Sequence, residues 1–253
     1  MNPALFVDTH CHLDAYFRPS EPAEAAARAG VQVIAVTNLP SARQRLKARL
    51  PSAAHVRIAL GAHPSEASKM HDGEWRILKA HVAGAEDIGE IGLDFSPGAD
   101  RAVQERVFSR VLSMVCDRPR FISVHSRRAV RQVLKHLAQA HVRAAVLHWF
   151  SGTPSELDAA LDAGHVLSVN TSMIATAKGR NLIQEMPRDR VLAESDGPFA
   201  RHHGRPAEPS DVLEVYMMLA RCWKVEICDV RAQLARNLEA VRVGIVTRAP
   251  SLF

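Results

Sequence analysis

Short apolar runs alternate along the chain with longer segments of helical period. The runs are rich in β-branched residues, and glycine or proline stands near most of their boundaries. Continuous apolar runs of this kind are typical of parallel strands that are buried on both faces. The eight predicted strands are Ala4–Val7, Val31–Val36, Val56–Leu60, Asp87–Ile91, Phe121–Val124, Ala144–Leu147, His165–Val169 and Arg190–Ala193.

The segments between these runs carry apolar residues at helical spacing. In one of them Val103, Val107 and Val111 fall on a single helical face. The loop Pro198–Pro209 is the longest segment predicted to be irregular, and the tail Val246–Phe253 has no clear pattern. The predicted helices are Pro22–Ala29, Ser41–Leu50, Asp100–Cys116, Arg127–Ala140, Pro154–Ala163, Ala177–Glu185, Asp211–Arg221 and Glu226–Ala240.

This alternation predicts an α/β fold, a (β/α)8 TIM barrel that occupies residues 1–253 as a single domain. A length of 253 residues is normal for such a barrel. An open doubly wound sheet is the alternative. No Gly-x-Gly-x-x-Gly sequence or phosphate loop follows any predicted strand, which counts against the nucleotide-binding versions of that alternative.

Composition and charge narrow the class of protein. Apolar residues make up 47% and charged residues 23% of the chain, which is typical of a soluble globular protein with a large core. The net charge of +5 is compatible with an anionic partner such as DNA, but also with an ordinary basic surface, because no dense Lys/Arg run occurs. We expect no signal peptide and no membrane span. The four cysteines form no Cys-x-x-Cys pair, which favours a cytoplasmic location.

Polar residues stand where the first and fourth predicted strands end, and active-site residues of such barrels lie at these C-terminal strand ends. His10 and His12 close the first strand, and side chains two apart on an extended segment point the same way. Glu90 lies inside an apolar sequence between glycines, where a carboxylate is costly unless it binds a cation or pairs with an arginine. Taken singly, each residue also has a purely structural explanation.

Later strands end in the same way, with His125 after the fifth, His148 after the sixth and Asp196 after the eighth. Four imidazoles and two carboxylates can hold two divalent ions, Mg²⁺, Mn²⁺ or Zn²⁺, if one carboxylate bridges them. Paired ions of this kind suit hydrolysis of phosphoesters. We therefore predict Glu90 and Asp196 as catalytic residues, with Asp196 both a ligand and the acceptor of the proton from the attacking water.

Six segments resemble, in order, the motifs of TatD-family metal-dependent deoxyribonucleases. The resemblance implies an amidohydrolase-like barrel that degrades DNA, typically from an end. The implied ligands are His10, His12, Glu90 and Asp196 for one ion, and Glu90, His125 and His148 for the other. The six segments are Asp8-Thr9-His10-Cys11-His12-Leu13-Asp14, Gly61-Ala62-His63-Pro64, Gly89-Glu90-Ile91-Gly92-Leu93-Asp94-Phe95, Val124-His125-Ser126-Arg127, His148-Trp149-Phe150-Ser151-Gly152 and Glu194-Ser195-Asp196-Gly197-Pro198.

Three further residues are predicted to bind substrate, and each has an alternative. His63 resembles a family histidine near the substrate phosphate, or it packs on Pro64 as a structural residue. Arg127 contacts phosphate or forms a supporting salt bridge. Trp149 stacks on a nucleobase, or it packs the mouth of the barrel with Phe150.

The segments Ser168–Met173 and Lys178–Arg180 resemble one branch of the family, the TatD-like subunit of the Qat anti-phage defence system. Trp149 stands where the family usually has a smaller residue. This resemblance implies work alongside other defence proteins. The alternatives to a deoxyribonuclease are a metal-dependent hydrolase of a small amide, ester or lactone, and a metal-binding scaffold subunit of a defence complex.

One loop beside the predicted site is basic. It holds Arg201, His202, His203 and Arg205 within the predicted irregular segment. Such a loop either holds a nucleic-acid backbone or is simply solvated.

Overall fold

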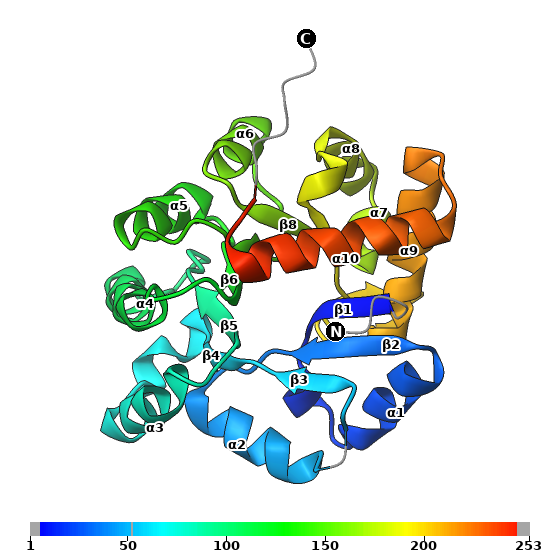
Figure 1. Cartoon of the computed structure of the whole chain (residues 1–253). Coiled ribbons are helices and arrows are strands. Elements are labelled where there is room, and N and C mark those ends of the chain that lie inside the picture. Colours follow the sequence, from blue (N-terminus) through cyan, green and yellow to red (C-terminus); the bar gives the residue numbers. More distant parts are fainter. Residues whose placement is uncertain (1–5, 52, 247–253) are drawn as a thin grey trace.

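The computed structural model describes residues 6–51 and 53–246, and its parallel strands surround a central axis with helices outside them (Figure 1). Ala4 and Leu5 of the first predicted strand, and the tail from residue 247, lie outside the described residues. The strands are β1 Phe6–Cys11, β2 Val31–Ala35, β3 Val56–Ile58, β4 Leu60–Ala62, β5 Asp87–Gly92, β6 Phe121–His125, β7 Val146–Leu147, β8 Val166–Val169 and β9 Val191–Ala193, followed by the short β10 Arg201–His202 and β11 Arg205–Pro206.

The strands β1 to β3 form one parallel sheet and β4 to β9 form a second. Ala59 separates β3 from β4, so these two strands are successive parts of the third predicted strand. At the other junction the Asp196 N–H donates to the His10 carbonyl at 2.9 Å, and the His12 N–H donates to the Gly197 carbonyl at 2.8 Å. The two sheets therefore make one barrel, which confirms the predicted fold class.

The helices cover the outside of the barrel, and α10 lies across the end where the strands begin (Figure 1). There Leu238 and Val241 of α10 pack on Val7, Phe121 and other residues of the barrel interior. The helices are α1 Ser20–Arg28, α2 Pro40–Arg49, α3 Asp72–Val82, α4 Arg101–Val115, α5 Val130–Gln139, α6 Pro154–Asp162, α7 Thr171–Ile174, α8 Ala177–Glu185, α9 Val212–Trp223 and α10 Ile227–Val243, with short 3-10 turns η1 Leu13–Ala15, η2 Pro64–Lys69, η3 Arg188–Arg190 and η4 Pro209–Asp211.

Several predicted boundaries differ from the structure. The sequence pattern did not indicate α3 or the short α7, and α5 begins at Val130 rather than at Arg127. The prediction that 198–209 is irregular was wrong in part, because β10 and β11 pair there as an antiparallel hairpin. None of the described helices combines the length and the apolar character that a membrane span requires. The extent of the domain over the whole of 1–253 stays a prediction.

Candidate active site

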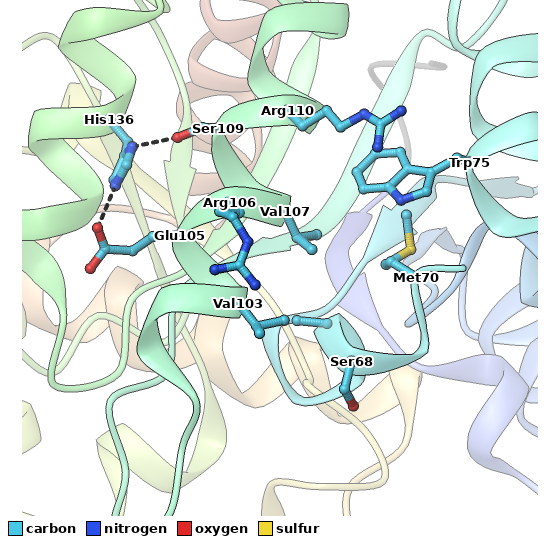
Figure 2. Close-up of a pocket in the computed structure, with 11 residues that line it drawn as sticks. Ser68, Met70, Trp75, Val103, Glu105, Arg106, Val107, Ser109, Arg110 and His136 are labelled. Atoms are coloured by element: carbon cyan, nitrogen blue, oxygen red, sulfur yellow. Dashed lines mark hydrogen bonds and ion pairs between the residues drawn. The ribbon is translucent and has the colours of Figure 1, made fainter. Parts of the chain in front are cut away.

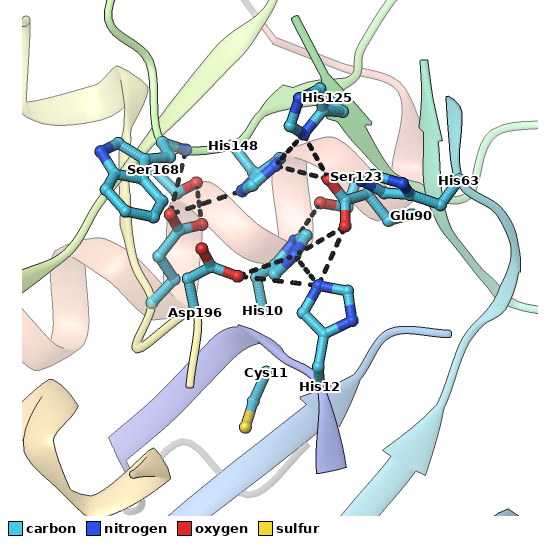
Figure 3. A network of polar contacts seen from close by, with 12 residues as sticks. His10, Cys11, His12, His63, Glu90, Ser123, His125, His148, Ser168 and Asp196 are labelled. Carbon is cyan, nitrogen blue, oxygen red and sulfur yellow. Dashed lines mark hydrogen bonds and ion pairs between the residues drawn. The ribbon is translucent and has the colours of Figure 1, made fainter. Parts of the chain in front are cut away.

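The six predicted metal ligands come together at the C-terminal ends of the strands (Figure 3). Five of them line a cavity of about 530 Å³ at the mouth of the barrel, and His10 lies beneath its floor beside His12 and Glu90. Cys11 lies between His10 and His12 in the sequence, and its side chain points away from the cluster, as expected on an extended strand (Figure 3). The sequence prediction that these residues share one site therefore agrees with their placement in the fold.

Glu90 is the centre of this cluster and is almost fully buried. Its Oε2 lies 2.9 Å from His12 Nε2 and 3.5 Å from His10 Nε2. Its Oε1 lies 2.6 Å from His125 Nδ1 and 2.7 Å from His148 Nε2. One carboxylate thus divides the imidazoles into two groups, with one oxygen facing each group.

The first group is completed by Asp196. The Nε2 atoms of His10 and His12 are 3.3 Å apart, and Asp196 Oδ1 lies 3.6 Å from each. The backbone of Asp196 has φ 46°, a left-handed conformation that is uncommon for residues other than glycine and is typical of functional sites. Gly197 follows in a tight space, because a Cβ there would lie 2.3 Å from the Ala207 carbonyl oxygen.

Glycine also determines how closely the strand that carries Glu90 approaches its neighbour. Gly92 has φ 136°, and a Cβ there would lie 2.1 Å from the carbonyl oxygen of His125. The Leu93 N–H donates to that same carbonyl at 2.9 Å. A side chain at position 92 would therefore separate β5 from β6 at the place where Glu90 and His125 face each other.

Four polar residues behind the ligands were not predicted from the sequence. Ser123 Oγ lies 2.7 Å from His10 Nδ1, Asp94 Oδ2 lies 3.0 Å from His125 Nε2, and Glu194 Oε1 lies 3.6 Å from His148 Nδ1. The remaining residue, Asp8, accepts from the Ser195 hydroxyl at 2.6 Å and so ties β1 to the segment that carries Asp196. Contacts of this kind fix the ring orientations of metal-binding histidines.

A sequence signal for these residues did exist. Glu194 follows the eighth predicted strand in a buried setting, as Glu90 follows the fourth, and Ser123 is a polar residue inside an apolar run. The argument that a buried polar side chain needs a partner applies to both as it does to Glu90.

Burial and mutual proximity shift the pKa values of this cluster in opposite directions. Burial and the neighbouring His148 lower the pKa of His10 to about 3. Burial raises the pKa of Asp196 to about 7. Burial alone would raise the pKa of Glu90, but the imidazoles of His63, His148 and His10 outweigh it and hold this pKa well below the usual value. The cluster therefore contains an ionised carboxylate beside an imidazole that stays neutral and can donate a lone pair.

These residues fit divalent cations. Imidazole nitrogen and carboxylate oxygen are the donors that zinc and related metals prefer. Among the described residues, three sets of donor atoms occur here, each with its own atoms within 4.8 Å of one another: His10, His12 and Asp196; His63, Glu90 and His125; and His10, His148 and Glu194. His148 Nε2 lies 3.1 Å from His125 Nδ1 and so belongs beside the second set.

The three residues predicted to bind substrate line the same cavity. His63 Nε2 lies 3.3 Å from Glu90 Oε1, and its Nδ1 accepts from the Ser65 N–H at 3.0 Å. Arg127 is exposed at the cavity wall, and Trp149 is partly buried there with φ 41°. The backbone N–H of Trp149 donates to Glu194 Oε1 at 2.9 Å, so the backbone of Trp149 is held by the same carboxylate that faces His148.

A wider hollow of about 980 Å³ lies outside the barrel, between η2, α3 and α4 (Figure 2). Arg110 stacks over Trp75 there, with the guanidinium carbon 4.0 Å from the ring centroid. His136 contacts Ser109 at 2.9 Å and Glu105 at 3.4 Å. No described residue of a barrel strand lines this hollow, so we place the chemistry in the smaller cavity.

Comparison with known proteins agrees with this site. The sequence profile described as TatD related DNase matches residues 7–242. A 3'-5' ssDNA/RNA exonuclease TatD of Pectobacterium carotovorum is 32% identical over 186 residues, which cover 69% of this chain and 71% of that protein.

Solved structures show the same fold. The crystal structure of YjjV, a TatD homologue from Escherichia coli, has a TM-score of 0.83 and 26% identity, covering 93% of this chain and 97% of that one. A TatD-family hydrolase from Entamoeba histolytica, at 14% identity, has a TM-score of 0.81 over 94% of this chain and 97% of its own, and supports the fold alone. This chain belongs to the TatD family of metal-dependent hydrolases and deoxyribonucleases.

Proposed function

We propose that this protein is a divalent-metal-dependent deoxyribonuclease that hydrolyses DNA phosphodiesters from a strand end. The observation that carries the proposal is Glu90, whose two oxygens face two separate groups of imidazoles at 2.6 to 3.5 Å. A carboxylate in this position is suited to bridge two cations, and paired cations suit phosphoester hydrolysis. The relative from Pectobacterium carotovorum is named as an exonuclease, which supports the same class of substrate.

In this proposal the ligands of one ion are His10, His12, Glu90 and Asp196, and those of the other are Glu90, His125 and His148. Two such ions, Mg²⁺, Mn²⁺ or Zn²⁺, supply Lewis acidity to the phosphoryl group and activate water for attack. The imidazole-rich donor set favours Zn²⁺ or Mn²⁺ over Mg²⁺, which prefers oxygen ligands.

The chain's own residues supply the proton acceptor and the orientation. Asp196 Oδ1 lies 3.6 Å from His10 Nε2 and from His12 Nε2, so this carboxylate stands where it could take a proton from a water at that ion. Ser123, Asp94 and Glu194 hold the rings of His10, His125 and His148 from behind. These contacts keep the lone pairs directed at the cavity.

The walls of the cavity provide contacts for a nucleic-acid strand. Arg127 presents an exposed guanidinium that suits a phosphate, and His63 lies between that wall and Glu90. Trp149 and Phe199 present aromatic faces on which a base can stack. The strand end would therefore enter between these residues with its phosphodiester over Glu90.

A degradation assay tests the proposal. Labelled single-stranded DNA, double-stranded DNA and RNA are each incubated with the protein and Mg²⁺, Mn²⁺ or Zn²⁺, and the products are resolved by length. We expect stepwise shortening of DNA by the wild type, and loss of this activity in both Glu90→Gln and His125→Ala. Equal activity in the wild type and both variants would contradict the assigned site. Activity on small esters, amides or lactones with none on DNA would favour the alternative hydrolase.

A role in anti-phage defence is the narrower form of this proposal, and it rests on the resemblance of 168–173 and 178–180 to the Qat branch. In this form the protein acts with other subunits of a defence complex in the cytoplasm. We expect deletion of the gene to raise phage plating at least tenfold, and Glu90→Gln to have the same effect. Protection that survives Glu90→Gln would instead indicate a metal-binding scaffold.

A further inference from the structure

A second cluster of metal-binding side chains lies on the rim of the barrel, outside the site described above. The hairpin β10–β11 brings His202 and His203 against Glu214 in the first turn of α9. Their ligand atoms all lie within 4.8 Å of one another. Glu214 does not line the cavity around Glu90, and neither do the two histidines.

The spacing of these atoms matches that of neighbouring ligands around zinc. His202 Nδ1 lies 3.0 Å from Glu214 Oε2, and His203 Nε2 lies 3.3 Å from Glu214 Oε1. Zinc bonds of about 2.0–2.1 Å in a tetrahedron place adjacent ligand atoms about 3.3 Å apart. The carboxylate also offers one oxygen to each imidazole, so small side-chain rotations suffice to direct all three groups at one point.

The ring nitrogen of His202 that faces away from Glu214 lies near a carboxylate, an arrangement typical of metal-binding histidines. Its second nitrogen, Nε2, lies 3.5 Å from Asp211 Oδ1. Arg205 in turn holds both oxygens of Asp211, at 2.8 and 2.7 Å. A carboxylate behind the ring fixes the tautomer and orientation that leave the other nitrogen free to bind a cation. These contacts also engage two of the basic residues of the loop, so that basic loop is not simply solvated.

The hairpin backbone places the second imidazole. His203 has φ 45° and Gly204 has φ 82°, so the tip of the hairpin is left-handed. A left-handed histidine is uncommon, and this one brings its ring to 4.2 Å from that of His202, centroid to centroid. Two protonated rings at this distance repel each other, whereas two neutral rings can share a divalent cation.

We propose that His202, His203 and Glu214 form a further metal site for a cation of the zinc type, separate from the ions at Glu90. Two histidines and one glutamate leave a fourth position open to water. The Arg201 N–H donates to Ser172 Oγ at 3.1 Å, so one side of the hairpin is already attached to α7. A cation would attach the other side to α9 and so hold the segment that follows Asp196 and Phe199.

Zinc counting on purified protein tests this site. The wild type and the variants His203→Asn and Glu214→Gln are dialysed against micromolar Zn²⁺, and bound metal is measured by mass spectrometry of the element. We expect about one equivalent of zinc fewer in each variant. His141→Asn is the matched control, because His141 is exposed, has φ 56° and belongs to none of the donor clusters among the described residues. Equal zinc contents in all four proteins would overturn the proposal.

Repeating the measurement in proteins that carry Glu90→Gln separates this site from the proposed nuclease site. The same comparison is made with Glu90→Gln present in every protein, and we expect His203→Asn to remove one equivalent there too. If His203→Asn loses zinc only when Glu90 is intact, the loss comes through the active site and the proposal fails. The measured quantity is bound zinc. An absence of nuclease activity would therefore refute the proposed function but leave the test of the His202, His203 and Glu214 site unaffected.

Discussion

The two ends of the barrel each surround a buried carboxylate with nitrogen donors, but with different consequences. At the end where the strands finish, Glu90 faces imidazoles from the residue after β1, from β6 and from the residue after β7. At the end where they begin, Asp87 accepts from Arg57 Nε at 2.6 Å and from Arg242 Nη2 at 2.7 Å. In such barrels the first end carries the chemistry and the second carries stability.

Asp87 and Glu90 differ in the protonation of the side chains that surround them. Guanidinium groups are charged at every pH that proteins experience, so Asp87 is neutralised without any ligand. An imidazole can lose its proton near neutral pH; burial with the neighbouring His148 lowers the pKa of His10 to about 3, whereas contacts with Glu90 outweigh burial and raise the pKa values of His12 and His148. Once its imidazoles are neutral, Glu90 and Asp196 carry negative charge that a divalent cation can balance. The same carboxylate chemistry thus forms an ion pair at one end and the centre of the proposed metal site at the other.

The largest expected effect is the loss of activity when the charge of Glu90 is removed. Glu90→Gln keeps the size of the side chain but removes the charge that both donor groups face, so we expect kcat/KM on single-stranded DNA to fall at least ~1000-fold, about 4 kcal/mol of transition-state stabilisation. Metal content should fall with it, while the Tm of the chelator-treated protein stays within a few degrees of the wild type. A variant that keeps both its metal and its activity would remove Glu90 from the site.

The matched change at the other end is Asp87→Asn. The change removes the negative charge and replaces one of the two acceptor oxygens by an NH2 group, so either Arg57 or Arg242 faces a donor, and we expect the free energy of unfolding to fall by ~3 kcal/mol in urea titrations. The kcat/KM of the folded protein should stay within twofold of the wild type. A large loss of activity with unchanged stability would show that the two ends are not separable in this way.

The sequence predicted the cluster of polar residues at the strand ends better than the rim that surrounds it. Glu90, His125 and His148 were found because buried parallel strands read as continuous apolar runs, and a polar residue at the end of such a run stands out. The hairpin β10–β11 has only two residue pairs and no apolar alternation, and its turn depends on left-handed φ values at His203 and Gly204. The local pattern of apolar and polar residues does not predict such a short hairpin or its left-handed backbone angles.

The missed helix α3 has a similar explanation. Its buried face is limited to Glu74, Trp75 and Leu78 within Asp72–Val82, and Gly73 stands in its first turn. Tertiary packing therefore stabilises this helix where the apolar period is short. Likewise Asp94 contacts His125 only because β5 and β6 lie side by side, a relation that becomes visible once the barrel is built.

A titration experiment sharpens the contrast between histidines at the two ends. His165 directly precedes β8, at the end where the strands begin, and burial with the nearby Arg190 lowers its pKa to about 4 from the usual 6.5. At the other end the pKa of His148 is raised, because contacts with Glu90 and Glu194 outweigh the effect of burial. The pKa values of His165 and His148 are therefore shifted in opposite directions, and at the end of His148 the pKa of His10 is lowered as that of His165 is.

For His165 the unfolded chain binds a proton between pH 6.5 and about 4 that the folded chain does not bind. The folded state therefore loses ~3 kcal/mol of stability as the pH falls through this window, and none above it. Urea unfolding at pH 7 and pH 4 measures this loss, and His165→Leu should reduce the difference between the two pH values by about that amount. Identical pH dependence in both proteins would show that His165 is not held neutral.

The smallest expected effect concerns the aromatic residues, which also differ between the ends. Phe121 is fully buried in the core beneath α10, whereas Trp149 and Phe199 line the open cavity. If Trp149 stacks on a base, Trp149→Ala should raise KM for single-stranded DNA about fivefold to tenfold, the equivalent of ~1 kcal/mol, with kcat unchanged. Trp149→Phe retains an aromatic face and should recover most of the affinity.

The other interpretation of Trp149 makes a different forecast for the same variants. A ring that only packs the barrel mouth with Phe150 contributes contact area to folding, so Trp149→Ala would lower Tm while KM stayed unchanged. The N–H of Trp149 donates to Glu194 through the backbone, so replacement of the side chain leaves that contact with the carboxylate behind His148 in place. A change in KM without a change in Tm therefore reports the ring itself, and the two measurements together decide whether this residue belongs to the chemical end of the barrel or to its packing.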